Sequence, residues 1–135
     1  MLYFLDTNIC IHYMRKGVFT DRIRSRIIQY GLRSIKIPAI VTGELMCGAY
    51  KSKRPEKTLK ETLDFLKNFD IVPFGEREAD IYGQIRADLE RKGHPIGNND
   101  MLIAATALSC NATLVTNNTQ EFSRIDSLNL TDWTI

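Results

Sequence analysis

The chain begins with an apolar run, Leu2–Leu5, which stops at Asp6 and is followed by Thr7 and Asn8. An unbroken apolar segment of this length is typical of a central strand in a parallel sheet, where helices cover both faces. Ligands of such sheets bind beyond the carboxyl ends of the strands, where Asp6 is expected to lie. Asp, Thr and Asn also favour helix caps, so the run alone leaves two roles open for Asp6, and capping is the simpler of them.

Strand and helix patterns alternate along the rest of the chain. The spacing predicts strands near 34–38, 71–74, 112–116 and 128–130, helices over 7–16, 19–29, 39–50, 55–68, 76–92 and 98–110, and a helical turn at 120–122. Such alternation predicts an α/β fold with three layers, in which helices cover a central, mainly parallel sheet of four or five strands. Pro73 places its strand near an edge of the sheet. No linker divides the chain, so residues 1–135 are expected to form one domain.

Charge is distributed unevenly between the two halves of the chain. Residues 1–67 carry 13 Lys and Arg and 6 Asp and Glu, a net of +7, whereas residues 68–135 carry 5 bases and 10 acids, a net of −5. Lys and Arg contacts to phosphate supply most non-specific affinity for nucleic acids, so the basic half favours a polyanionic partner. A solvated helix face explains either basic cluster, Arg22–Arg26 or Lys51–Lys60, equally well.

Membrane, disulfide and zinc classes find no support in the sequence. No apolar run approaches the ~20 residues that span a bilayer, and no signal peptide is evident, so a cytoplasmic location is expected. The cysteines, Cys10, Cys47 and Cys110, are few and widely spaced. Such a set argues against a disulfide framework and against structural zinc, and all three are predicted to be small buried residues.

Two acids interrupt helix faces that should be apolar. Glu44 lies four residues after Ile40 and four before Gly48, on a stripe expected to be buried. Asp100 is followed by apolar residues at three, four, seven and eight positions further on. A buried carboxylate is costly unless it is paired, hydrogen-bonded or bound to a metal. A salt bridge for Glu44 and stabilisation of a helix N-terminus by Asp100 remain alternatives for each residue taken alone.

Taken together, Asp6, Glu44 and Asp100 are expected to meet at one edge of the sheet. The ends of parallel strands and the starts of the following helices share that rim, and Thr116 and Asn118 close another strand there. Carboxylates that lie close together repel one another, and a divalent cation relieves that repulsion. A ligand set of oxygen atoms favours Mg²⁺ or Mn²⁺ over zinc.

Several short motifs along the chain contain these acids or lie between them. They are Leu5–Asn8, Val41–Leu45 with Gly48, Ile85–Ala87, Pro95–Asp100 leading into Ile103–Ala105, Leu114–Asn118, Phe122 and Asp132–Trp133. In order and spacing, these motifs resemble those of the PIN-domain nucleases, specifically the VapC-type toxins of bacterial toxin–antitoxin pairs. The resemblance covers essentially the whole chain.

The resemblance implies a metal-dependent endoribonuclease in which Asp6, Glu44 and Asp100 bind Mg²⁺ or Mn²⁺. The cation would bind a phosphate oxygen and a water, lower the pKa of that water and stabilise the in-line transition state. Family members are similar in cutting structured RNA, including transfer and ribosomal RNA, to leave a 5′-phosphate and a 3′-hydroxyl. Asn118 stands where many PIN domains carry a fourth acid. An amide is a weaker ligand, so one or two metal ions remain possible.

Other roles also follow from the resemblance. Thr116 is expected to support Asp6, and Arg86 is expected to contact the RNA backbone. Independently of the resemblance, Thr7 and Asn8 are expected to cap the helix that follows the first strand. A VapB-type antitoxin is expected to lie in the groove of the toxin and to bind operator DNA for both proteins. The toxin is expected to form a homodimer within the larger complex and to have no membrane partner.

Two other function classes are alternatives to the nuclease. A non-catalytic PIN-like module would bind RNA or protein only, but such a module gains nothing from buried acids that cost stability. A metal-dependent phosphatase would carry a second acid two residues after Asp6, where this chain has Asn8. The paired acids of a receiver domain are equally absent. Sensitivity to EDTA separates the nuclease from a module that only binds.

Overall fold

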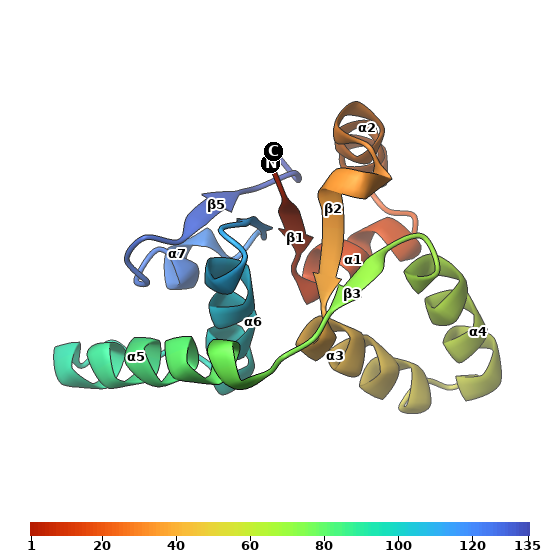
Figure 1. The fold of residues 1–135 in the computed structure, drawn as a ribbon. Helices are drawn as coiled ribbons and strands as arrows, with labels where there is room; N and C mark the ends of the chain where they lie inside the picture. Colours follow the sequence, from red (N-terminus) through yellow and green to blue (C-terminus); the bar gives the residue numbers. More distant parts are fainter.

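Short parallel strands form the central sheet of the computed structural model, which describes residues 1–135 (Figure 1). The strands are β1 (Tyr3–Leu5), β2 (Ile35–Pro38), β3 (Asp70–Val72), β4 (Thr113–Val115) and β5 (Asn129–Thr131). They form one five-stranded sheet in the order β3-β2-β1-β4-β5, and every neighbouring pair is parallel. The predicted α/β fold with a mainly parallel sheet is therefore confirmed.

The position of each strand follows from its composition. All three residues of β1 are buried, which agrees with the apolar run and with its place at the centre of the sheet. β3 lies at an edge and exposes Asp70 and Ile71, as expected for a strand that runs into Pro73. β1 thus delivers Asp6 to the middle of the carboxyl-terminal rim.

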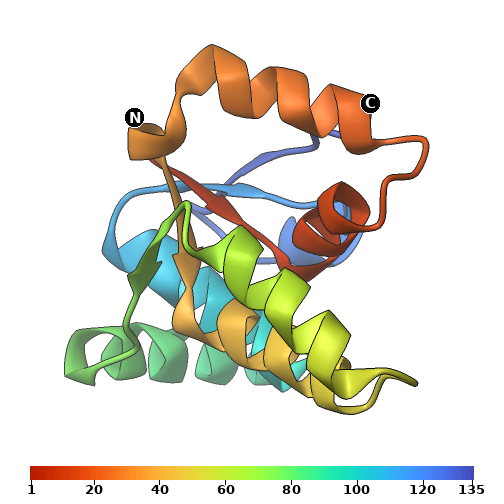
Figure 2. The same ribbon diagram turned by 90° about the vertical axis from the view of Figure 1, so that its right-hand side faces the viewer.

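Helices flank the sheet at the positions that periodicity predicts. They are α1 (Thr7–Met14), α2 (Thr20–Tyr30), α3 (Ala39–Tyr50), α4 (Pro55–Leu66), α5 (Glu76–Lys92), α6 (Asn98–Ser109) and the short α7 (Thr119–Phe122), with a 3₁₀ turn at Leu32–Ser34. In Figure 2, α2 lies above the strands, and α3, α4 and α5 lie below them. No helix combines the length and the hydropathy that are needed to cross a bilayer.

The end of the sheet opposite Asp6 is closed by aromatic side chains. Trp133, near the C-terminus, is almost fully buried. Its ring centroid lies 5.4 Å from that of Tyr3 in β1 and 5.7 Å from that of Tyr30 in α2. Aromatic pairs at this spacing stabilise a core beyond the area that they bury. This cluster ties the last residues of the chain to the first strand and leaves the rim at Asp6 to other residues.

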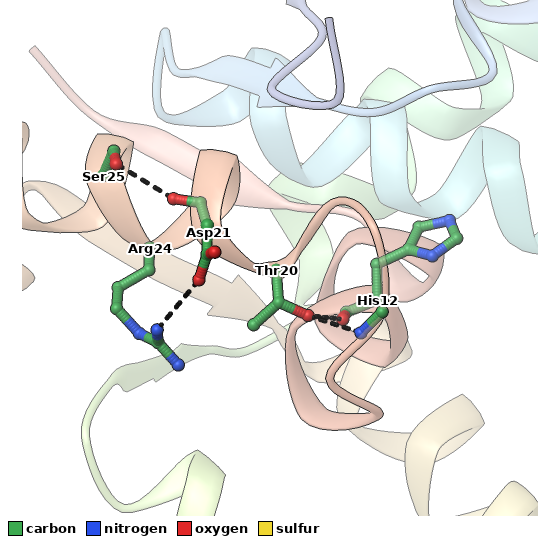
Figure 3. Close-up of polar contacts among 6 residues, drawn as sticks. His12, Thr20, Asp21, Arg24 and Ser25 are labelled. Carbon is green, nitrogen blue, oxygen red and sulfur yellow. Dashed lines mark hydrogen bonds and ion pairs between the residues drawn. The ribbon is translucent and has the colours of Figure 1, made fainter.

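A polar corner connects α1 to α2 (Figure 3). The Thr20 hydroxyl donates to the carbonyl oxygen of His12 at 2.9 Å and accepts from the backbone N–H of Gly17 at 2.8 Å. On the first turns of α2, Arg24 pairs with Asp21 at 3.2 Å. These contacts fix where α1 ends, and therefore where Arg15, the residue that follows α1, is presented.

The prediction for two of the three cysteines was wrong. Cys10 is buried, whereas Cys47 and Cys110 are exposed. The buried side chains of α3 are Val41, Leu45 and Ala49. Cys47 points away from this face, and Cys110 follows the end of α6.

The predicted core stripe of α3 was wrong in its width. Gly48 is exposed, and Ile40 and Glu44 lie at the margin of the buried face, which is narrower than the full set of apolar positions suggested. Glu44 is therefore half-buried rather than enclosed by the core. This placement gives its carboxylate access to solvent at the rim of the sheet.

Two glycines of α5 are expected to respond in opposite directions to substitution by alanine. Gly93 ends the helix in the left-handed region, at φ 71° and ψ 24°, and alanine there should lower the free energy of unfolding by about 1 kcal/mol. Gly83 lies inside the helix with open space where a Cβ would be, and alanine there should raise it by about 1 kcal/mol. Urea unfolding of both variants checks the prediction, and equal signs would contradict it.

Candidate active site

Asp6 is buried at the point where β1 ends, with 5% of its surface exposed. Its Oδ1 accepts a hydrogen bond from the backbone N–H of Thr7 at 2.8 Å, so Asp6 itself is the N-cap of α1. Its Oδ2 accepts from the hydroxyl of Thr116 at 2.7 Å. Burial raises the pKa of Asp6, and these two hydrogen bonds oppose the rise. The two roles left open for Asp6 are thus compatible, because capping uses only one carboxylate oxygen.

Thr116 holds Asp6 from the neighbouring strand. It follows β4 and is fully buried. While its hydroxyl donates to Asp6, the same oxygen accepts from the backbone N–H of Asn118 at 3.0 Å. An oriented hydroxyl of this kind favours the charged form of the carboxylate. This is the supporting contact that the sequence analysis expects of Thr116.

Glu44 reaches the site from α3 and is held by α1. The Thr7 hydroxyl donates to Oε1 of Glu44 at 2.8 Å. Thr7 therefore links the two helices instead of capping α1, so its predicted capping role is corrected. Asn8 is exposed, and its side chain makes no hydrogen bond, which also removes it from the cap.

Asp100 lies in the first turn of α6 and is half-buried. Its pKa is raised to about 6, first by burial and then by the negative charges of Asp6, Glu121 and Glu44. Carboxylates from four segments of the chain therefore act on one another at this rim. Apolar periodicity after Asp100 correctly identified it as the start of a buried face, since Ile103 is fully buried.

Glu121 is a candidate site residue that the sequence analysis missed. It lies in α7, and its carboxylate Oε2 accepts from the side-chain amide of Asn118 at 3.3 Å. The amide of Asn118 thus orients a fourth acid at the site. The available signal was an acid three residues after Asn118, in the first turn of a helix that begins where β4 leaves the rim.

Arg86 is exposed and held by its own helix. Its guanidinium donates to Oε1 of Glu90 at 3.0 Å and to the hydroxyl of Tyr82 at 2.9 Å. These partners lie one turn away on either side, so the contacts stiffen the surface of α5. Contact between Arg86 and RNA remains a prediction.

The carboxylates suit a hard divalent cation bound partly through water. No group of three or more His, Cys, Asp or Glu side chains is arranged so that all of them could hold one metal ion directly. Mg²⁺ does not require such a group, because it retains several waters and binds through one or two carboxylates. The raised pKa of Asp100 indicates uncompensated negative charge that a cation would neutralise. The donor set fits a cation that keeps waters and takes one or two of these carboxylates directly, and both oxygens of Asp6 keep a free lone pair.

Comparison with known proteins identifies relatives along the whole chain. Residues 3–128 match the family described as PIN domain. The chain is 41% identical to Ribonuclease VapC2 of Rickettsia felis over 98% of both proteins. It is 37% identical to the tRNA(fMet)-specific endonuclease VapC of Shigella flexneri over 97% of both. Its fold matches a chain in the crystal structure of VapBC2 from Rickettsia felis bound to a DNA fragment from their promoter, with a TM-score of 0.91 and 40% identity over 98% of this chain and 99% of that one.

Proposed function

This chain belongs to the PIN-domain family, among the VapC-type ribonucleases, and from that premise we propose how it works. Residues 1–135 act as one domain that cuts RNA phosphodiester bonds, with Mg²⁺ or Mn²⁺ held by Asp6, Glu44 and Asp100. The observation that carries the proposal is the pair of hydroxyl contacts that hold two carboxylates at one rim beside Asp100, Thr116 to Asp6 at 2.7 Å and Thr7 to Glu44 at 2.8 Å. A cation bound there supplies a Lewis acid for the phosphate and lowers the pKa of water.

The three proposed ligands have different roles, which follow from how firmly each carboxylate is held. Asp6 is fixed by Thr116 and by the backbone of Thr7, so it holds its position before the substrate arrives. Glu44 is held through one hydroxyl at 2.8 Å and keeps its other oxygen free to orient water or accept a proton. Asp100, with a pKa of about 6, is mostly ionised above neutral pH.

The relatives point to the substrate and to the regulating partner. One of them is named for transfer RNA, and another is seen with its antitoxin on promoter DNA. We therefore assign transfer or ribosomal RNA as the substrate and a VapB-type antitoxin as the inhibitor, with operator DNA bound through the antitoxin. A homodimer in the cytoplasm, within a larger toxin–antitoxin complex, completes the assignment.

A cleavage assay with purified protein tests the proposal. Total transfer RNA incubated with Mg²⁺ or Mn²⁺ should yield discrete fragments with 5′-phosphate ends, and excess EDTA should abolish them. Glu44→Gln should cut much more slowly, because an amide is a weaker ligand and a poorer base than a carboxylate. RNA binding that is indifferent to metal, without any cleavage, would instead support the non-catalytic module.

A further inference from the structure

A cavity of about 420 Å³ opens beside Glu44 and is lined by residues of α1, α3 and α4 and of the segments next to them. Its apolar floor includes Met14 and Leu45. Polar groups line its mouth, among them the Ser52 and Thr58 hydroxyls. Small-molecule sites typically measure ~300–1,000 Å³ and combine an apolar lining with a few convergent polar groups. The cavity has the size and the composition of a site for one small ligand.

One cation without a partner, Arg15, lines this cavity beside the carboxylates of Glu44 and Glu61. Three further cations, Lys51, Lys53 and Arg54, lie in the turn between α3 and α4. None of these four basic side chains takes part in a salt bridge or in a side-chain hydrogen bond, and the one ion pair that involves a residue lining the cavity is Lys57–Glu61. Free guanidinium and ammonium groups beside an apolar cavity suit a ligand with an apolar ring and a phosphate.

We propose that this cavity binds one unpaired nucleotide of the RNA substrate, next to the phosphate that is cut. The inference rests on the proposed function, since Glu44 is shared by the cavity and the metal site. The base lies on Met14 and Leu45, and the phosphate contacts Arg15. Recognition of single-stranded RNA commonly relies on bases that are splayed out into such pockets.

Glu61 gives the cavity a means of choosing the base. Glu61 lines the cavity, and its carboxylate pairs with Lys57 at 4.0 Å. A carboxylate accepts hydrogen bonds and donates none, so it favours a base edge with N–H donors. Guanine presents two adjacent donors on its Watson–Crick edge, whereas uracil presents one donor between two acceptors. The cavity is therefore assigned to guanine in preference to uracil.

Gly48 allows the cavity to be filled without harm to the fold. It lines the cavity within α3, and a Cβ built there meets no atom within 4 Å. Leucine is a better helix former than glycine, so Gly48→Leu should fold with an undiminished melting temperature. Gly83→Leu is the matched control, because Gly83 also lies in a helix with open space around its Cβ, outside this cavity.

The test is titration of guanosine and uridine 5′-monophosphates in EDTA, followed by NMR of the Met14 methyl group. Wild type and Gly83→Leu should bind the guanosine nucleotide more tightly than the uridine one. Gly48→Leu and Arg15→Ala should each weaken guanosine nucleotide binding at least tenfold, and Glu61→Gln should remove the preference between the bases.

Outcomes that overturn the cavity assignment differ from those that overturn the nuclease assignment. If Gly48→Leu leaves nucleotide binding intact but weakens binding of a VapB-type antitoxin, the cavity belongs to the partner protein and the inference is wrong. It is also wrong if wild type binds neither nucleotide while it still cuts RNA with Mg²⁺. The absence of any metal-dependent cleavage by wild type, whatever the titration shows, refutes the proposed function instead.

Discussion

Replacing Asp100 by asparagine should reduce RNA cleavage at least ~100-fold and at the same time make the metal-free protein more stable. The first effect follows because the variant lacks one of the proposed metal ligands. The second follows because burial and three neighbouring carboxylates raise the pKa of Asp100 to about 6. Removal of this charge relieves repulsion in the folded state. Replacing an acid with a purely structural role would not combine a loss of cleavage with a gain in stability.

The gain in stability should depend on pH with a defined sign. The pKa of Asp100 is 3.8 without these neighbours and about 6 in the folded protein. Between these values the folded state binds more protons than the unfolded state, so the contribution of Asp100 to stability is lost as pH rises through this range. Because the side chain is half-exposed, solvent screening limits the loss to about 1 kcal/mol.

Urea unfolding in EDTA measures this effect. At pH 7.5, Asp100→Asn should be about 1 kcal/mol more stable than wild type, and near pH 4 the difference should shrink because wild-type Asp100 is then largely protonated. Asp126→Asn is the control, since the Asp126 side chain is 81% exposed and its replacement should change stability by no more than ~0.5 kcal/mol. A loss of stability in Asp100→Asn at pH 7.5 would contradict charge repulsion at the site.

Thr116→Val should lower the free energy of unfolding by roughly 2 kcal/mol at neutral pH, the usual worth of a hydrogen bond to a charged group. The hydroxyl of Thr116 donates at 2.7 Å to Oδ2 of Asp6, and both residues are buried. Valine has the same shape but no donor, so Asp6 would keep its charge with one hydrogen bond fewer. Cleavage should also fall, because Asp6 loses the contact that orients it.

The pH dependence of the stability deficit of Thr116→Val shows whether the deficit comes from the lost hydrogen bond to Asp6 or from poor packing of valine. Without the donor, the folded-state pKa of Asp6 rises further, so the deficit of Thr116→Val should be largest at high pH and shrink as pH falls. Thr116→Ser keeps the hydroxyl and should retain most of the activity. A deficit of equal size at pH 5 and pH 8 would show that the hydroxyl does not stabilise an ionised Asp6.

Much of the fold can be read from local patterns. The apolar run before Asp6 predicts a central strand because only a strand covered on both faces can bury every residue, and β1 has this position. Pro73 predicts an edge strand because proline has no backbone N–H to donate to a neighbouring strand. Both patterns involve only residues close together in the sequence, and so does the backbone geometry that they determine.

The site is less completely predictable because its contacts join distant segments. Helical spacing places Glu44 on the apolar side of α3, but it does not give the width of the buried face. In the structure that face is narrow, and Glu44 lies at its margin. Spacing also cannot show that Thr7 turns its hydroxyl to Glu44, 37 residues away. Glu121 was missed because an acid in the first turn of a helix is common and breaks no pattern; in the structure the amide of Asn118 donates to it, and its charge raises the pKa of Asp100.

A metal-induced shift in melting temperature tests the central claim most directly, namely that Asp6, Glu44 and Asp100 hold one cation. Adding Mn²⁺ after removal of EDTA should raise the melting temperature of wild type, because a ligand that binds only the folded state stabilises it. The variants Asp6→Asn, Glu44→Gln and Asp100→Asn should each show a much smaller shift, whereas the control Asp126→Asn should match wild type. Equal shifts in wild type and in all three site variants would contradict a shared metal site.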